Sequence, residues 1–195
     1  MKIFISLLLF PLICCAQKRE VTDKSSIELD FIKLLSATTE VVELVVLQDM
    51  KTYFPASFKS FPDLNPINPS NDHKISSRFS SKRLHPIYGK VKAHNGIDIV
   101  AKLNTPVYAT ADGTIEKSQF FNGAAGHSVS INHKFGFVTR YFHLNIFIVE
   151  NGEKVKKGQI IGFLGSTGSS TAPHLHYEIW KNKKVIDPKY FLNSK

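Results

Sequence analysis

The sequence predicts an all-β domain, an antiparallel sheet sandwich, that follows a short and partly helical N-terminal extension. Three features favour this class. From residue 75 onward, short β-branched and aromatic runs alternate with turns rich in Gly and Asn. Apolar residues make up 43% of the 195 residues, which is enough to bury a core. The chain contains no internal repeat and no βα alternation, which argues against a solenoid or an α/β barrel.

The first segment predicts a secretory signal peptide over residues 1–16. Lys2 precedes an apolar run, and small residues end the segment, while the run is too short to span a bilayer as an anchor. Cleavage after Ala16 leaves no cysteine in the mature protein. The alternative is a lipid anchor at Cys15, although Cys14 stands where lipoprotein signals carry Gly, Ala or Ser. We expect export to the periplasm or the extracellular space, or a membrane-anchored lipoprotein.

The next segment, residues 17–74, is expected to be an extension or linker with some helix. Phe31, Leu34 and Leu35 recur at helical spacing, and one or two helices are expected between residues 27 and 51. Residues 41–47 fit a strand equally well. Four prolines between residues 54 and 72 break regular structure, so this part is interpreted as a linker or a wrapping arm.

The remaining residues, 75–195, are expected to form the β-domain. Gly- and Asn-containing turns separate its runs, as in antiparallel sheets. Seven strands are predicted, over residues 97–101, 106–110, 113–118, 127–132, 137–142, 159–164 and 175–180.

The formal net charge of +9 favours a polyanionic partner such as an acidic cell wall or anionic lipid, although charge that only keeps the protein soluble explains it equally well. An exported protein seldom meets nucleic acid, so we expect no nucleic-acid partner. We also expect no transmembrane helix and a monomer.

Two groups of histidines suggest a metal site. His94 and Asp98 lie four residues apart, and His174 and His176 lie two apart, so each pair shares a face if its segment is extended. Gly96 leaves room between the first two. Two imidazoles and one carboxylate form a donor set of catalytic zinc, which leaves a position open for water. Spacing alone leaves open which histidine of the second pair binds, and these donors also suit other divalent metals.

The metal motifs belong to an ordered series of segments. The series comprises His-Asn-Gly-Ile-Asp at 94–98, Thr-Pro-Val-Tyr-Ala at 105–109, Ala-Asp-Gly-Thr-Ile at 111–115, Tyr-Phe-His-Leu at 141–144, the Gly-bounded run 152–162, Gly-Ser-Thr-Gly at 165–168, Pro-His-Leu-His-Tyr-Glu at 173–178 and Asp-Pro at 187–188. With this series, residues 75–191 resemble the peptidase M23 family, the lysostaphin-type zinc endopeptidases of bacterial cell walls.

The resemblance implies a role for five residues. His94, Asp98 and His176 would hold one Zn²⁺ per chain, while His143 and His174 would act in the reaction. The substrate would be the peptide cross-links of peptidoglycan, cut by metal-activated water. The alternative is a catalytically silent relative that binds the wall and activates another hydrolase, but all five positions are present. An amidohydrolase would carry its His-x-His early, on a first barrel strand.

One region departs from the family pattern. Where the family tends to carry Phe-Gly-x-Arg, this chain has Ser80 in place of Gly, and Arg83 falls one residue late. The departure concerns a turn and one wall of the groove rather than the metal site. Tyr88 stands where some members place a tyrosine that stabilises the oxyanion, and packing is the other interpretation.

Other polar residues receive simpler interpretations. His73, His127 and His133 are expected at the surface or in turns. His85 is a candidate for the groove wall, and Glu178 is a candidate partner of His176. The Gly- and Ser-rich loop 165–171 is not a phosphate cradle, because no Lys follows it in the required position.

Overall fold

The computed structural model describes residues 24–37, 49–68, 70–84, 89–120 and 123–192. The chain divides into two compact units, Met1–Phe58 and Lys59–Lys195. Several predictions lie outside the described residues, namely the signal peptide 1–16, the run 41–47, His85 and Tyr88. Among the described helices, none is both long and apolar enough to cross a lipid bilayer.

The described residues of the first unit include the α-helix α2 (Lys24–Ala37) and the short 3-10 helix η1 (Asp49–Thr52). Phe31 and Leu35 are buried and lie one turn apart on the same side of α2, as an amphipathic helix requires. The ring of Phe31 stacks on Phe54 with centroids 4.8 Å apart. The predicted helix near the N-terminus is therefore confirmed, although it begins three residues earlier than expected.

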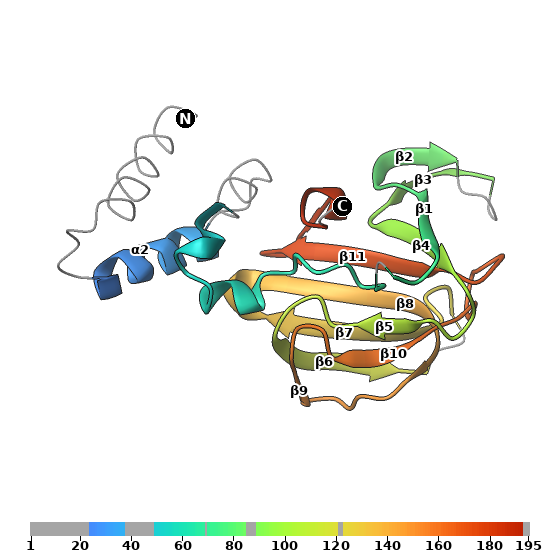
Figure 1. The fold of residues 1–195 in the computed structure, drawn as a ribbon. Coiled ribbons are helices and arrows are strands. Elements are labelled where there is room, and N and C mark those ends of the chain that lie inside the picture. The colour runs from blue at the N-terminus through green and yellow to red at the C-terminus, as the bar shows by residue number, and fades with distance from the viewer. Residues whose placement is uncertain (1–23, 38–48, 69, 85–88, 121–122, 193–195) are drawn as a thin grey trace. The chain divides into compact units, whose positions relative to one another are not determined.

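The second unit is built on a ten-stranded sheet in which every pair of strands is antiparallel (Figure 1). The main path runs β1 (His73–Ser77), β4 (Ile97–Ala101), β11 (Leu175–Lys181), β8 (Phe137–Phe147), β7 (His127–His133), β6 (Gly113–Gln119) and β9 (Lys154–Val155). Off this path, β10 (Ile160–Leu164) pairs with β5 (Pro106–Tyr108) and β8, and β12 (Lys184–Ile186) pairs with β11. The predicted all-β class is confirmed.

The core of this unit alternates with its surface along the strands. In β7 and β11 the apolar side chains at every second position are buried, including Val129, Ile131, Tyr177 and Ile179. This is the period of two that a sheet with one covered face requires. Burial of these side chains fixes the register, since a slip by one residue would turn them outward.

Residues 59–68 pack onto the β-unit as an arm. Phe61 is buried, with its ring centroid 5.2 Å from that of Phe137 and 5.4 Å from that of Phe191. The backbone joins the arm to the sheet, because the amide of Tyr108 donates to the carbonyl of Pro66 at 2.9 Å. The compact unit therefore begins at Lys59, ahead of the expected domain start at residue 75.

A separate two-stranded sheet, β2 (Ser80–Leu84) and β3 (Val91–His94), stands beside β1 and β4 (Figure 1). The chain leaves β3 and enters β4 through Asn95 and Gly96. A Cβ on Gly96 would lie 2.2 Å from the carbonyl oxygen of Tyr177 in β11, so only glycine permits this close approach. The approach brings the end of β3 next to β4 and β11.

Candidate metal centre

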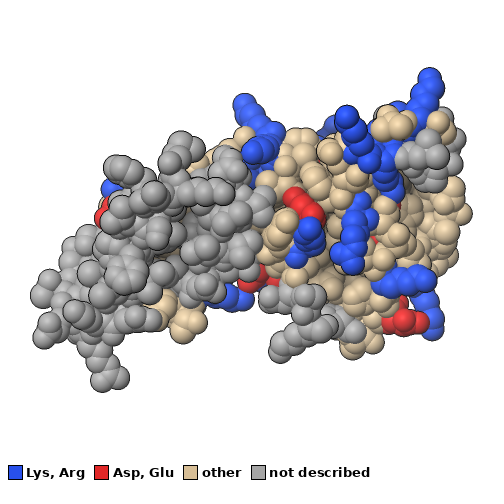
Figure 2. Space-filling model, turned by 90° about the horizontal axis from the view of Figure 1, so that it is seen from above, with Lys and Arg blue, Asp and Glu red and all other residues tan. Residues whose placement is uncertain are grey.

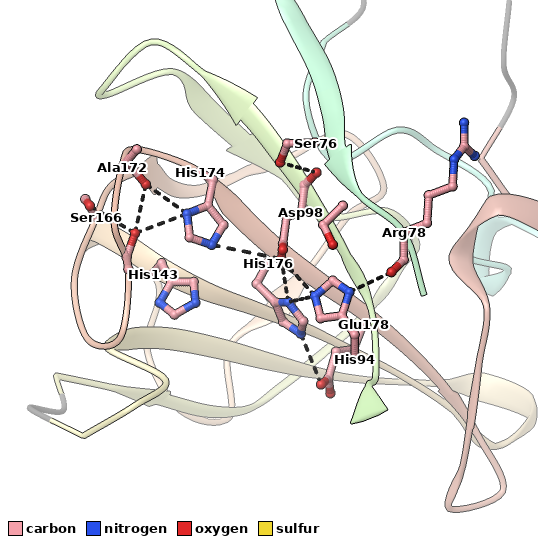
Figure 3. Close-up of polar contacts among 12 residues, drawn as sticks. Ser76, Arg78, His94, Asp98, His143, Ser166, Ala172, His174, His176 and Glu178 are labelled. Carbon is pink, nitrogen blue, oxygen red and sulfur yellow. Dashed lines mark hydrogen bonds and ion pairs between the residues drawn. The ribbon is translucent and has the colours of Figure 1, made fainter. Parts of the chain in front are cut away.

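Three side chains from different strands meet at one point. Nε2 of His94 lies 3.0 Å from Oδ1 of Asp98 and 3.0 Å from Nδ1 of His176. Nδ1 of His176 lies 2.8 Å from the same Asp98 oxygen. Figure 3 shows the three side chains pointing toward one another. The donor atoms are therefore as close together as the ligands of a single ion.

The sheet positions each of these donors. Asp98 in β4 lies directly opposite His176 in β11 in the antiparallel register. His94 ends β3 and pairs with Ser80 of β2, so it reaches the cluster from the two-stranded sheet. All three side chains are largely removed from solvent, with exposed fractions of 5% for His94, 13% for Asp98 and 14% for His176.

The protonation of the cluster shows whether these residues suit a cation. Nδ1 of His94 donates to the carbonyl of Arg78 at 2.7 Å, so Nε2 of the neutral ring carries a lone pair. Burial alone raises the pKa of Asp98, but hydrogen bonds from His176 and His94 outweigh burial and hold it well below its usual value. Burial lowers the pKa of His176, yet hydrogen bonds to Asp98 and Glu178 raise it to about 9. The cluster thus favours a positive charge at its centre, and a divalent metal fits the donors.

A second group of residues contacts the ring nitrogen of His176 that does not face the cluster. Nε2 of His176 donates to Oε1 of Glu178 at 3.2 Å, which leaves Nδ1 to face the cluster. Nε1 of Trp180 donates to the other Glu178 oxygen at 2.7 Å. The guanidinium of Arg140 lies 3.8 Å from Oε2 of Glu178 and 4.5 Å from the Trp180 ring centre. Such carboxylate–histidine pairs fix the orientation and tautomer of metal ligands.

The two other predicted histidines lie beside the cluster. His143 and His174 have ring centroids 4.6 Å apart, and Nε2 of His174 lies 3.9 Å from Oδ1 of Asp98. Each Nδ1 donates to a backbone carbonyl at 2.8 Å, that of Thr167 for His143 and that of Ala172 for His174. In the neutral rings, both Nε2 atoms are therefore free to accept a proton. Burial, and then the charge of His174, lowers the pKa of His143 to about 4.

The backbone at His143 is unusual for a residue inside a strand. Its φ is +62°, in the left-handed region, and the register of β8 with β7 shifts at this point. Its amide donates to the carbonyl of Ala125 at 3.0 Å. A bulge of this kind redirects a side chain out of the regular alternation and is frequent beside active sites. Here it accompanies the approach of His143 to His174.

The cluster opens into a groove. Its lining includes Ala93 and Asn95 near the end of β3, and Ala125 and Ala172 from two loops. The side chains away from the histidines are mostly small.

The structure brings the five predicted residues together, but several residues that contact them were not predicted. Trp180, Thr167 and the carbonyl of Arg78 were not among the candidates from the sequence, although Trp180 shares a strand face with Glu178 two residues before it. The expectation of a surface position for His133 is wrong. This residue is 5% exposed in β7, with Nδ1 donating to the carbonyl of Asp112 at 2.9 Å and Nε2 lying 2.8 Å from the Thr139 hydroxyl. These bonds satisfy the ring and allow its burial.

These histidines and the carboxylate thus define an antiparallel β-domain with a candidate metal centre. The chain belongs to peptidase family M23, whose family model matches residues 92–188. The peptidoglycan DD-endopeptidase ShyC of Vibrio cholerae is 45% identical over 125 residues, which cover 62% of this chain and 29% of ShyC. The chain thus spans less than a third of the length of this relative.

Solved structures agree with this assignment. The catalytic domain of lysostaphin from Staphylococcus simulans is 32% identical, with a TM-score of 0.53, and the match covers 63% of this chain and 92% of that domain. A zinc-containing peptidase from Vibrio cholerae is 38% identical, with a TM-score of 0.58, over 63% of this chain and 37% of that one. The lysostaphin-type fold expected from the sequence is confirmed.

Proposed function

We propose that this protein is a zinc-dependent endopeptidase that hydrolyses the peptide cross-links of bacterial peptidoglycan. One Zn²⁺ per chain would be held by His94, Asp98 and His176. The observation that carries the proposal is the meeting of these three donors, from β3, β4 and β11, within 3.0 Å of one another.

A zinc ion held by these donors would supply Lewis acidity, which lowers the pKa of water from about 15.7 toward about 7. The protein's own residues handle the protons. Nε2 of His143 or His174 accepts a proton from the attacking water, since both Nδ1 atoms are already engaged with carbonyls. The same histidines then donate to the departing amine. Glu178 keeps His176 in the tautomer that presents Nδ1 to the cluster.

The substrate class rests on the relatives. ShyC is named a peptidoglycan DD-endopeptidase, and so is ShyA of Vibrio cholerae, which is 44% identical over 106 residues. The groove, with its small lining side chains, suits an extended cross-link peptide. Action on the wall requires export, to the periplasm or beyond, in agreement with the signal peptide or Cys15 lipid anchor expected from the sequence.

The test is digestion of purified muropeptides by the full chain, with and without a chelator, followed by mass analysis of the fragments. Metal content is measured on the same sample. We expect about one zinc per chain, and peptide fragments that vanish with the chelator and return when zinc is restored. Digestion that continues after complete removal of metal contradicts the mechanism. Zinc binding without any cleavage instead supports the silent, hydrolase-activating alternative.

A further inference from the structure

The groove carries an uneven set of charges. Among the described residues that line it, Arg83 is the only Lys or Arg. Its two carboxylates, Asp98 and Glu178, are each hydrogen-bonded to His176. Small uncharged side chains such as Ala93 and Ala172 make up much of the rest. A substrate in the groove therefore meets one side chain with a fixed positive charge.

The guanidinium of Arg83 is held by its neighbours, but not all of its N–H donors form hydrogen bonds. Nη1 donates to the hydroxyl of Ser77, and Nε is buried with no hydrogen-bond partner among the described residues. Nη2 lies 3.7 Å from Oδ2 of Asp98, which is an ion-pair distance and too long for a hydrogen bond. The side chain remains 26% exposed. Because a guanidinium has five N–H donors, Arg83 keeps donors available to a ligand.

The carboxylate of Asp98, which lies beside Arg83, is hydrogen-bonded to two histidines. Oδ1 of Asp98 lies 2.8 Å from His176 and 3.0 Å from His94, and the proposed metal would draw further on its charge. Arg83 is then only partly neutralised, beside the point where the scissile bond would lie. A planar guanidinium there matches a carboxylate in a two-bond geometry better than any uncharged group.

We propose that Arg83 binds a free carboxylate of the substrate next to the scissile bond. Arg83 thereby makes the enzyme select cross-links that carry such a carboxylate, as a diamino dicarboxylic acid does, over uncharged bridges. This inference rests on the proposed endopeptidase function and adds to it a residue that determines specificity.

The test uses two synthetic cross-link peptides that differ only in that carboxylate, one as the free acid and the other as its amide. We expect the wild-type zinc enzyme to prefer the acid by about tenfold to a hundredfold in kcat/KM, mainly through a lower KM, as one charge-assisted contact provides. Arg83→Gln is expected to abolish the preference by slowing only cleavage of the acid. Arg83→Lys keeps the positive charge but lacks the planar guanidinium, and it is expected to retain part of the preference for the acid.

Lys82→Gln is the matched control, because Lys82 is an exposed neighbour in β2 and its loss removes the same charge. We expect it to leave the preference intact. Equal cleavage of acid and amide by the wild type overturns the inference, whatever the variants do. So does an Arg83→Gln enzyme that keeps the preference, or one that loses zinc and cleaves both peptides more slowly. If the zinc enzyme cuts neither peptide nor any muropeptide, the proposed function itself fails.

Discussion

At the scale of single residues, the histidines of the candidate site differ in which ring nitrogen is hydrogen-bonded to a neighbour. His176 has Nε2 hydrogen-bonded to Glu178 and presents Nδ1 to His94 and Asp98 in the candidate metal centre. His143 and His174 have Nδ1 bound to carbonyls and present Nε2. In the proposed mechanism, the neighbouring acceptor therefore decides which ring nitrogen is left for the metal or for proton transfer.

This division predicts different losses for two histidine variants. His176→Ala should lose zinc and activity together, because one of three donors is gone. His143→Ala should retain zinc and lose turnover by about a hundredfold or more, as expected for removal of a proton-transferring group. His174→Ala should behave like His143→Ala. Zinc content by atomic absorption and kcat on a muropeptide check these outcomes. A His143 variant that binds no zinc contradicts the assignment.

Glu178 provides a second test. Glu178→Gln keeps the size of the side chain but removes the charge that orients His176, so the zinc dissociation constant should rise about tenfold to a hundredfold. Trp180→Phe removes the N–H that donates to Glu178 but keeps an aromatic ring at this position, and should have a smaller effect. Competition with a chromogenic chelator measures both. Equal zinc affinity in all three proteins would show that Glu178 does not support the ligand.

His133 predicts a dependence of stability on pH. Burial lowers its pKa to about 4, against 6.5 for an unperturbed histidine. The unfolded chain therefore binds an extra proton between these values, so the stabilisation is complete above pH 6.5 and is lost as the pH falls toward 4. Its full size is about 3 kcal/mol. Urea unfolding at pH 7 and pH 4.5 should show a larger loss for the wild type than for His133→Gln. Parallel losses in both would contradict this.

At the scale of elements, the sequence predicts the buried strands well and the exposed ones poorly. The strand expected over residues 97–101 matches β4 at both ends. In contrast, β2 and β3 are rich in Ser and Lys and largely exposed, so pairing with a neighbour rather than propensity holds them in place. A strand was expected to end at residue 142, yet β8 continues to Phe147 because a bulge at His143 lets its last residues pair with β10.

The candidate site was predictable for a related reason. Its five residues stand in short motifs whose types and order mark them, whereas their supporting contacts join residues far apart in the chain. The carbonyl of Arg78 reaches His94, and Thr167 reaches His143, only after the sheet has formed. The left-handed φ of His143 likewise has no local signal, since histidine is not a usual residue for that conformation.

Gly96 is the connection on which the site most depends. In Gly96→Ala, the new Cβ would meet the Tyr177 carbonyl, which is backbone and cannot turn away. We expect a loss of about 1–3 kcal/mol in the free energy of unfolding and weaker zinc binding, since β3 and β11 must separate. Val91→Ala, at an exposed position of β3, should change stability by less than about 0.5 kcal/mol. Thermal unfolding and zinc titration of both variants are the measurements, and unchanged zinc affinity in Gly96→Ala would contradict this dependence.

At the scale of the whole molecule, the positive charge of the surface affects which partners the protein approaches. Figure 2 shows Lys and Arg side chains spread over one face of the described residues, with few Asp and Glu among them. With a net charge of +9, this surface is suited to approach an anionic polymer, and the attraction should weaken with salt.

The arm at residues 59–68 limits how far the chain can be shortened from its N-terminus without destabilising the second unit. A chain that starts at Lys59 keeps Phe61 between Phe137 and Phe191, so it should fold cooperatively. A chain that starts at residue 75 loses this ring and should be less stable by about 3–5 kcal/mol, the usual cost of removing a buried phenylalanine. Urea unfolding compares the two, with Phe61→Ala in the full chain as the control. Equal midpoints for both truncated chains would contradict the role of the arm.

A metal ion bound at this site would also hold the two-stranded sheet against the large sheet. His94 belongs to β3, whereas Asp98 and His176 belong to the large sheet, so an ion shared by all three would staple one sheet to the other. At a free zinc concentration a thousandfold above the dissociation constant, this staple would contribute about 4 kcal/mol to the folded state. Chelation would then speed deuterium uptake at residues 91–94 before it affects β8. A bound ion would thereby also slow the opening of the groove wall.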